Sequence, residues 1–483
     1  MTIPTISTIA LDLGTTSIKS GLLDQHGVLK HIVARPAPKI SVNDGRYESD
    51  ALAYAAVADQ ALSESIAHAV GCKTFGLCSQ RSSFLIWEKY SGRPITPLIS
   101  WQDNRGATSC EDLRAHEKSI RTLTGLPLTR YYFAPKLRSL LLANPDWLAR
   151  LAGGELLTGT LETFLIWRWS GGKHHVTDAS MAARTLLMDI RQHQWSQTLC
   201  DLFGIPMHIL PQIKPSAELD IPLTNGLTLT ASVADQSAAL IASVLEDRAE
   251  VLVNLGTGCF VVRYLTENNL NQAALPGYLL MQVYQDGRLH PHFAVEGTLN
   301  SIAAALAPYP VDECRTEDLA ADDIFCLAEP SGLGAPYFAN CRFAACYPDP
   351  LHTNLGVQFS RPVEHLSQRG IAVLLLEAII FRVARILEDF HREFPIERVY
   401  LSGGLSELTC LQQGVARCVP FDVYQLRQSE SSLQGAALLA AGMTLASCRE
   451  SEKISSTHDA SALLEKYRHW KAWLDDLLGS DKT

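Results

Sequence analysis

The chain has 483 residues, is 47% hydrophobic and carries a formal net charge of −10 at neutral pH. Because this length exceeds what one hydrophobic core usually supports, we expect two domains. The negative charge and the lack of a basic stripe exclude a nucleic-acid partner, since a phosphate backbone binds to clustered positive charge.

The first half of the chain alternates strand and helix patterns. Apolar segments at residues 8–11 and 21–23 predict an opening hairpin. Apolar residues at helical spacing over residues 50–69 predict a helix, and residues 75–78 predict a strand that leads into Ser79-Gln80-Arg81.

The second half repeats this plan. Residues 251–258 and 259–264 predict a strand, a turn and a second strand, and residues 371–390 predict a long buried helix. A strand at residues 399–401 then ends in Ser402-Gly403-Gly404. A final helix at residues 462–478 has one apolar face. This face consists of Leu463, Tyr467, Trp470, Leu474 and Leu477.

We therefore predict two similar α/β domains with a cleft between them. The expected boundaries are residues 1–245 for the first domain, residues 246–450 for the second and residues 451–483 for a C-terminal helix packed on the second domain. A partner-binding role for that helix is the alternative to core packing.

Two glycine turns follow apolar strands and predict two phosphate clamps, because such turns leave backbone N–H groups free to meet an anion. The first contains Gly14, Thr15 and Thr16, and the second contains Gly256, Thr257 and Gly258. Beside the first turn, Asp12 offers a hard oxygen ligand for Mg²⁺ and Lys19 a charge for phosphate. The alternative for both turns is an ordinary tight β-hairpin.

The chain resembles the FGGY carbohydrate kinases of the actin, Hsp70 and sugar-kinase superfamily over nearly its whole length. Besides the two turns, the matching segments, in order, are Trp101-Gln102-Asp103-Asn104-Arg105, Thr177-Asp178-Ala179-Ser180, Ala234-Asp235-Gln236, Gly334-Ala335-Pro336-Tyr337, Ser402-Gly403-Gly404 and Gly435-Ala436-Ala437. The resemblance implies two actin/ribonuclease-H-like domains with an interdomain catalytic cleft. It also implies phosphoryl transfer from ATP with Mg²⁺, and dimerisation is common in the family.

By this resemblance, Asp235 is the base that accepts a proton from the attacking hydroxyl. Capping of the helix that follows is the alternative role of Asp235. Gly403 and Gly404 would lie beside adenosine, where a side chain would block a close approach. Two positions depart from the family, because Ala234 replaces a glycine before Asp235 and Leu405 replaces a small residue after Gly404.

The segment that begins at Gln80 looks most like glycerol kinase within the family. By resemblance, the residues expected to contact the substrate are Gln80, Arg81, Trp101, Tyr131, Asp235, Gln236 and Phe260. For the aromatic residues among them, core packing is the alternative. Where glycerol kinases place a glutamate after the arginine, this chain has Ser82, which has no carboxylate for two hydroxyls. We therefore expect a ketose such as xylulose, with glycerol as the alternative.

Other classes of protein are weaker hypotheses. A non-catalytic sugar sensor would lack Asp235 or carry a basic DNA-binding module, and a regulatory ATPase would need a separate client-binding domain. The pairs His290/His292 and His174/His175 lack further ligands at metal-binding spacing. The 12 scattered cysteines and the absence of an N-terminal leader predict a reduced cytoplasm. No segment predicts a membrane span.

Overall fold

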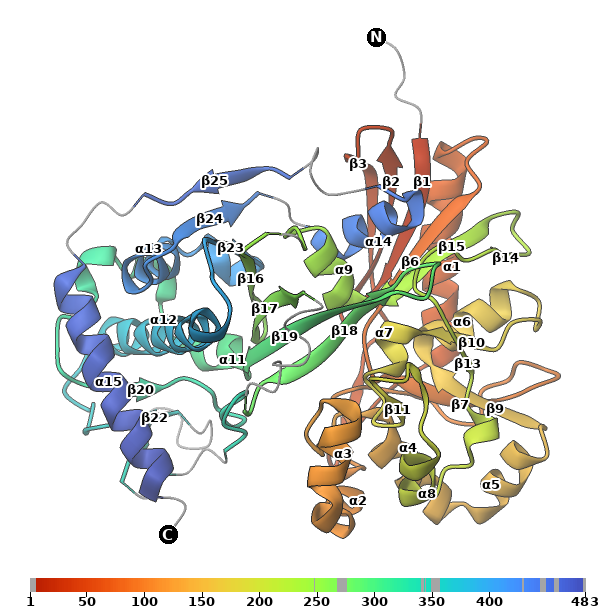
Figure 1. Cartoon of the computed structure of the whole chain (residues 1–483), viewed down its shortest axis with the longest axis horizontal. Helices are drawn as coiled ribbons and strands as arrows, with labels where there is room; N and C mark the ends of the chain where they lie inside the picture. Colours follow the sequence, from red (N-terminus) through yellow and green to blue (C-terminus); the bar gives the residue numbers. More distant parts are fainter. Residues whose placement is uncertain are drawn as a thin grey trace. The chain divides into compact units, whose positions relative to one another are not determined.

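The structure, a computed structural model (Figure 1), describes residues 6–246, 248–266, 276–339, 343, 345–348, 357–427, 430–443, 449–455 and 460–480. Its contacts divide the chain into two compact units. Unit 1 comprises Met1–Ala242, Leu280–Phe293 and Glu430–Cys448, and unit 2 comprises Ser243–Leu279, Ala294–Ser429 and Arg449–Thr483.

The main sheet of unit 1 has six strands in the order β14-β15-β6-β1-β2-β3. They are β1 (Ile6–Leu13), β2 (Ser17–Asp24), β3 (Leu29–Pro36), β6 (Thr74–Ser79), β14 (Ile221–Pro222) and β15 (Thr228–Ala234). The adjacent strands β1, β6 and β15 run parallel, whereas β2 returns antiparallel from β1 as the predicted hairpin. Leu13 pairs with Ser79, and Ser79 pairs with Ala234, so the three parallel strands end at the same edge.

Helices cover both faces of this sheet because side chains alternate along each strand. Leu11 of β1 packs in the same core as Tyr54 of α1 (Ala51–His68), where Asp50 caps the helix by accepting hydrogen bonds from two backbone N–H groups. The next residue toward the N-terminus, Ala10, packs against Leu433 of α14 (Ser431–Ala441) on the other face. The predicted helix at residues 50–69 is thereby confirmed.

The helix α14 comes from the last part of the chain and yet completes unit 1. A Cβ atom on Gly76 of β6 would lie 2.4 Å from the Ala436 carbonyl oxygen, and one on Gly435 would lie 1.8 Å from the Ala238 carbonyl oxygen in α9 (Asp235–Ile241). Glycine therefore permits close contacts of α14 with the sheet and with α9. Residues 280–293 also join unit 1, where Gln285 exchanges backbone and side-chain hydrogen bonds with Ser216. The expected second domain, residues 246–450, included both of these segments, whereas the structure groups them with unit 1.

Smaller elements complete unit 1. A second sheet has the order β4-β5-β8-β7-β9, and two strand pairs join β10 to β13 and β11 to β12. These strands are β4 (Ser41–Asn43), β5 (Arg46–Ser49), β7 (Phe84–Glu88), β8 (Leu98–Ile99), β9 (Leu156–Thr160), β10 (Val176–Asp178), β11 (Met188–Asp189), β12 (Gln194–Trp195) and β13 (Gln212–Lys214). The helices are α2 (Ala107–Asp112), α3 (Glu117–Thr124), α4 (Phe133–Ala143), α5 (Pro145–Ala152), α6 (Leu161–Trp169), α7 (Ala179–Ala182) and α8 (Gln197–Phe203).

The second large sheet is also mixed, and its seven strands have the order β18-β19-β17-β16-β23-β24-β25. Besides β18, they are β16 (Glu250–Leu255), β17 (Cys259–Leu265), β19 (Pro291–Leu299), β23 (Arg398–Ser402), β24 (Asp422–Leu426) and β25 (Ser451–Lys453). As in unit 1, an antiparallel hairpin (β16 and β17) lies beside a parallel neighbour, β23. The strand β18 (Leu279–Gln285) falls almost entirely in the segment of residues 280–293 that belongs to unit 1. The described part of unit 2 also contains β20 (Cys326–Leu327), β21 (Tyr347–Pro348) and β22 (Gln358–Phe359).

The core of unit 2 is formed around α12 (Gln368–Glu393), which includes the predicted long helix. The described part of unit 2 also contains α11 (Ile302–Leu306), α13 (Thr409–Cys418) and α15 (Ser461–Ser480). The predicted apolar face of α15 is buried, and Lys466 of α15 forms an ion pair of 2.5 Å with the buried Glu377 of α12. Within the described ranges, no helix combines the length and apolar character that a membrane span requires.

Candidate active site

Three sequence-predicted residues of unit 1 follow the three parallel strands that end in register. Gly14 follows β1, Gln80 follows β6 and Asp235 follows β15. The carboxyl edge of parallel strands is where α/β folds place their ligands. Asp12 and Arg81, which are near the ends of β1 and β6, lie at the same edge as Asp235.

Asp235 is the first residue of α9, and its carboxylate is partly accessible. Ala234, rather than Asp235, occupies the N-cap position, so the alternative role of Asp235 as the cap is wrong. Its Oδ1 atom accepts a hydrogen bond of 2.7 Å from the backbone N–H of Gln236 and lies 3.8 Å from Nε of Arg81. The side chains of Arg81 and Asp235 are 16% and 24% exposed, which leaves both open to a ligand.

A buried polar chain that sequence reasoning did not single out holds the peptide before Asp235. The backbone N–H of Ala234 donates to the hydroxyl of Ser180, and this hydroxyl donates to Asp178 at 2.7 Å. Asp178 also accepts from Ser216 at 2.6 Å. Burial raises the pKa of Asp178 to about 6, although these hydrogen bonds oppose the shift. The signal was present in the sequence, because Asp178 and Ser180 belong to one of the family-like segments.

Asp12, near the end of β1, has the properties of a cation ligand. Its Oδ1 atom is buried and has no hydrogen-bond partner. Burial, together with the nearby negative charge of Asp235, raises the pKa of Asp12 to about 7, while Cys78 and Lys19 lower it. A carboxylate oxygen with no protein partner fits a hard divalent cation such as Mg²⁺. The described residues contain no group of three His, Cys, Asp or Glu side chains that could hold a metal.

Lys19 is already paired within unit 1. It lies opposite Asp12 in the β1–β2 register, and its Nζ atom is 2.6 Å from Oε2 of Glu430, the residue before α14. The two side chains are 25% and 21% exposed. A phosphate that binds to Lys19 would therefore compete with Glu430 or share the ammonium group with it. No local pattern points to Glu430 as a partner of Lys19, because 411 positions separate the two residues.

The first glycine turn is held by its own hydrogen bonds. Gln80 is 4% exposed, and its amide accepts from the Thr15 hydroxyl at 3.1 Å. The same Thr15 hydroxyl accepts from Nε1 of Trp101 at 3.0 Å. Tyr54 donates to the carbonyl of Gly14 at 2.7 Å. The Gln80 amide and the Thr15 hydroxyl thus hold the turn, and in this turn Thr16 is the exposed hydroxyl residue.

The predicted substrate side of unit 1 has an aromatic wall and a serine turned away from it. The rings of Trp101 and Tyr131 lie 6.2 Å apart at 44°. Ser82, which follows Arg81, has φ of +62° and is 6% exposed. Its hydroxyl donates to the carbonyl of Arg184 at 3.1 Å. Residue 82 therefore supplies no carboxylate next to Arg81.

The predicted glycines of unit 2 differ in the space that a Cβ atom would have. Because Asn254 of β16 pairs with Ser402 of β23, the second glycine turn and Gly403 follow neighbouring parallel strands. A Cβ atom on Gly403 would lie 2.4 Å from the Leu255 carbonyl oxygen, and one on Gly258 would lie 2.8 Å from that of Leu299. By contrast, Cβ atoms on Gly256 and Gly404 would meet no atom closer than 3.9 Å. Packing against the residues that the structure describes therefore does not require glycine at these last two positions.

The other predicted residues of unit 2 lie near the same strand ends. Thr257 is exposed, and its carbonyl oxygen accepts a hydrogen bond from the backbone N–H of Ala303. Phe260 of β17 is partly buried and pairs with Asn254 across the hairpin.

Each of the two α/β units has a glycine turn between antiparallel strands and a parallel third strand beside it. Residues 7–233 match the N-terminal domain, and residues 251–443 the C-terminal domain, of the FGGY family of carbohydrate kinases. The chain belongs to this family and is a phosphotransferase that acts on a sugar or polyol with ATP. The predicted family and the two-domain α/β fold are confirmed.

Two curated proteins illustrate the similarity in sequence. A glycerol kinase of Paracidovorax citrulli is 30% identical, with 89% of this chain and 90% of that protein covered. An apulose kinase of Pectobacterium atrosepticum is 29% identical, with 96% of each covered. Among solved structures, Plasmodium falciparum glycerol kinase with ADP has a TM-score of 0.84 at 21% identity, covering 98% of each chain. Xylulose kinase from Rhodospirillum rubrum has a TM-score of 0.79 at 19% identity, covering 97% of this chain and 98% of that one.

Proposed function

We propose that the protein transfers the γ-phosphoryl group of ATP to a hydroxyl of a ketose such as xylulose. The observation that carries the choice of a ketose is the orientation of Ser82, whose hydroxyl donates to Arg184 rather than facing a ligand beside Arg81. Without a carboxylate at this position, the site loses a fixed acceptor for two neighbouring hydroxyls and gains room. Both effects favour a longer acceptor than glycerol.

In this proposal Asp235 accepts the proton of the attacking hydroxyl. Its partial exposure and the 3.8 Å separation from Arg81 support a substrate hydroxyl that contacts both side chains. Trp101 and Tyr131 would wall the carbon chain. Gln236 and Phe260 are proposed as further substrate contacts, whereas the buried Gln80 would act by holding the first glycine turn.

The nucleotide is proposed to bind at the two glycine turns and at the glycine pair after β23. In unit 1 the contributing residues would be Gly14, Thr15, Thr16 and Lys19, and in unit 2 Gly256, Thr257, Gly258, Gly403 and Gly404. The open space at Gly256 and Gly404 supports a ligand that approaches the backbone there. Asp12 would hold Mg²⁺, which neutralises phosphate charge during the transfer. The unpartnered Oδ1 atom of Asp12 supports this role.

Glycerol is the second candidate acceptor. The observation in its favour is the number of glycerol kinases among the similar curated proteins, at 28–30% identity. For glycerol to be the substrate, another acceptor would have to compensate for the serine at position 82.

An ADP-release assay with a panel of acceptors tests the proposal. The panel contains glycerol, erythritol, xylulose, ribulose, fuculose, rhamnulose, sedoheptulose and gluconate. We expect the highest kcat/KM for one of the ketoses. A preference for glycerol would reject the ketose assignment, and silence across the panel with ATP still bound would point to a non-catalytic sensor or another acceptor.

A further inference from the structure

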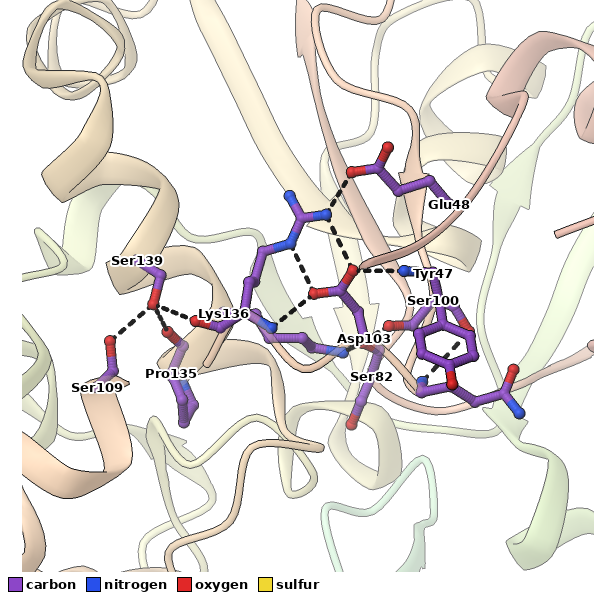
Figure 2. Close-up of polar contacts among 11 residues, drawn as sticks. Tyr47, Glu48, Ser82, Ser100, Asp103, Ser109, Pro135, Lys136 and Ser139 are labelled. Carbon is purple, nitrogen blue, oxygen red and sulfur yellow. Dashed lines mark hydrogen bonds and ion pairs between the residues drawn. The ribbon is translucent and has the colours of Figure 1, made fainter. Parts of the chain in front are cut away.

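Lys136 is a buried lysine whose ammonium group joins two loops of unit 1 (Figure 2). It lies on α4 and its side chain is completely buried. Its Nζ atom donates one hydrogen bond of 2.9 Å to the carbonyl oxygen of Ser82 and another of 2.9 Å to that of Ser100. The two carbonyls belong to different loops, one after β6 and one after β8.

Each of these carbonyls is next to a residue of the proposed substrate site. Ser82 follows Arg81 directly, and Ser100 precedes Trp101. Ser82 also holds a left-handed backbone conformation that is unfavourable for a residue other than glycine. Such a conformation persists only where surrounding contacts impose it. The hydrogen bonds of Ser82 with Arg184 and Lys136 are contacts of this kind.

Among the residues that the structure describes, no carboxylate forms an ion pair with Lys136 to offset its burial. The negative charge of Asp103 favours the ammonium form of Lys136, but Asp103 forms an ion pair with Arg105, which also pairs with Glu48. Burial consequently lowers the pKa of Lys136 to about 7. A neutral amine keeps two N–H donors, which matches the two carbonyl acceptors, so both hydrogen bonds persist in either protonation state.

We propose that Lys136 is a positioning residue for the phosphoryl acceptor: it fixes the backbone on either side of the substrate pocket so that Arg81 and Trp101 keep a constant separation. The inference rests on the proposed function, because it takes these two residues as substrate contacts. A shift of about 1 Å in such groups can lower a rate by about 10²-fold, so two interior hydrogen bonds have a large effect on catalysis.

The test compares Lys136→Met with Ser139→Ala. Methionine has a similar length and volume but no donor, whereas Ser139 lies one turn further along α4 and contacts Ser109 and the carbonyl of Arg105 instead of the two loops. Hydrogen exchange is measured over residues 80–84 and 99–103, and KM is measured for xylulose, glycerol and ATP. Lys136→Arg, which keeps the donors, is the second variant should Lys136→Met not fold.

We expect Lys136→Met to raise exchange in both segments and to raise the KM of the acceptor at least tenfold, with the KM of ATP unchanged. Ser139→Ala should change neither the hydrogen exchange of these segments nor the KM of the acceptor. Lys136→Arg should have a lower acceptor KM than Lys136→Met. Unchanged exchange in Lys136→Met, or equal effects in Ser139→Ala, would overturn the proposal. Raised exchange with an unchanged acceptor KM would overturn it as well, and would show that Arg81 and Trp101 do not bind the acceptor. If the wild-type enzyme uses neither acceptor while ATP still binds, the proposed function fails independently of the exchange result.

Discussion

Nε of Arg81 and Oδ1 of Asp235 lie 3.8 Å apart at the ends of two adjacent strands. This distance is within the range of an ion pair but too long for a hydrogen bond. A hydroxyl group that binds near the two side chains can therefore donate to the carboxylate and accept from the guanidinium group. In the proposed function, this hydroxyl belongs to the acceptor, and Asp235 would take its proton.

Replacing Asp235 by asparagine should stop proton transfer while leaving the fold intact. The amide keeps the size of the side chain but cannot accept the proton, so we expect kcat to fall by about 10²–10⁴-fold. ADP binding, measured by equilibrium titration, should change little. Turnover equal to that of the wild type would remove Asp235 from the mechanism.

The raised pKa of Asp12 predicts that Mg²⁺ binding depends on pH. Below its pKa of about 7 the carboxyl group is protonated and cannot bind a cation, so the apparent affinity for Mg²⁺ should fall about tenfold per pH unit from pH 7 to pH 5. Above pH 8 it should level off. Calorimetric Mg²⁺ titrations in the presence of ADP measure this dependence. Asp12→Asn should bind weakly at all pH values, and an equally steep profile in that variant would assign the titration to another group.

The raised pKa of Asp12 also makes the stability of the metal-free protein depend on pH. Stability should fall as pH rises, whereas the affinity for Mg²⁺ should increase. Between about pH 4 and pH 7 the folded state keeps the Asp12 proton that the unfolded state has already released. The contribution of Asp12 to the free energy of unfolding should therefore decrease as pH rises through this window. Denaturant unfolding of the wild type and Asp12→Asn at pH 5 and pH 7 isolates the contribution, which disappears in the variant.

The sequence predicted the elements that have a strong local pattern. The periodicities of α1, α12 and α15 and the apolar strands β1, β6, β16 and β23 all correspond to observed elements. Both glycine turns follow the expected strands. These features depend on neighbouring residues, so a single sequence contains enough information for them.

Local sequence patterns do not predict contacts between residues that are far apart in the chain. The pairing of Lys19 with Glu430 requires α14 to pack in unit 1, and nothing near either residue indicates this. Similarly, no local pattern around Lys136 indicates that its ammonium group reaches two loops. The use of the Gln80 amide to hold the first glycine turn also depends on the tertiary position of Thr15.

Alanine substitutions of the adjacent residues Gly403 and Gly404 should have different effects, one on stability and the other on ADP binding. Gly403 has φ of +86°, and a Cβ atom there would collide with the carbonyl of Leu255, so Gly403→Ala should destabilise the protein by about 2 kcal/mol or more. In Gly404→Ala the new methyl group would meet no protein atom within 4 Å. Stability should then be unchanged while the affinity for ADP falls. Denaturant unfolding and ADP titration of both variants check this, and unaltered ADP affinity in Gly404→Ala would place the adenosine elsewhere.

Placing a carboxylate at position 82 should shift the acceptor preference toward glycerol. Ser82→Glu puts a negatively charged acceptor next to Arg81, and a hydrogen bond to a charged group contributes about 1.5–3 kcal/mol. We therefore expect kcat/KM for glycerol to rise at least tenfold, while the value for xylulose falls because the longer side chain would take up space proposed for the longer acceptor. Ser82→Gln is the matched control, since it has the same size without the charge. A similar gain in Ser82→Gln would attribute the change to shape, and no gain in either variant would mean that residue 82 does not select the acceptor.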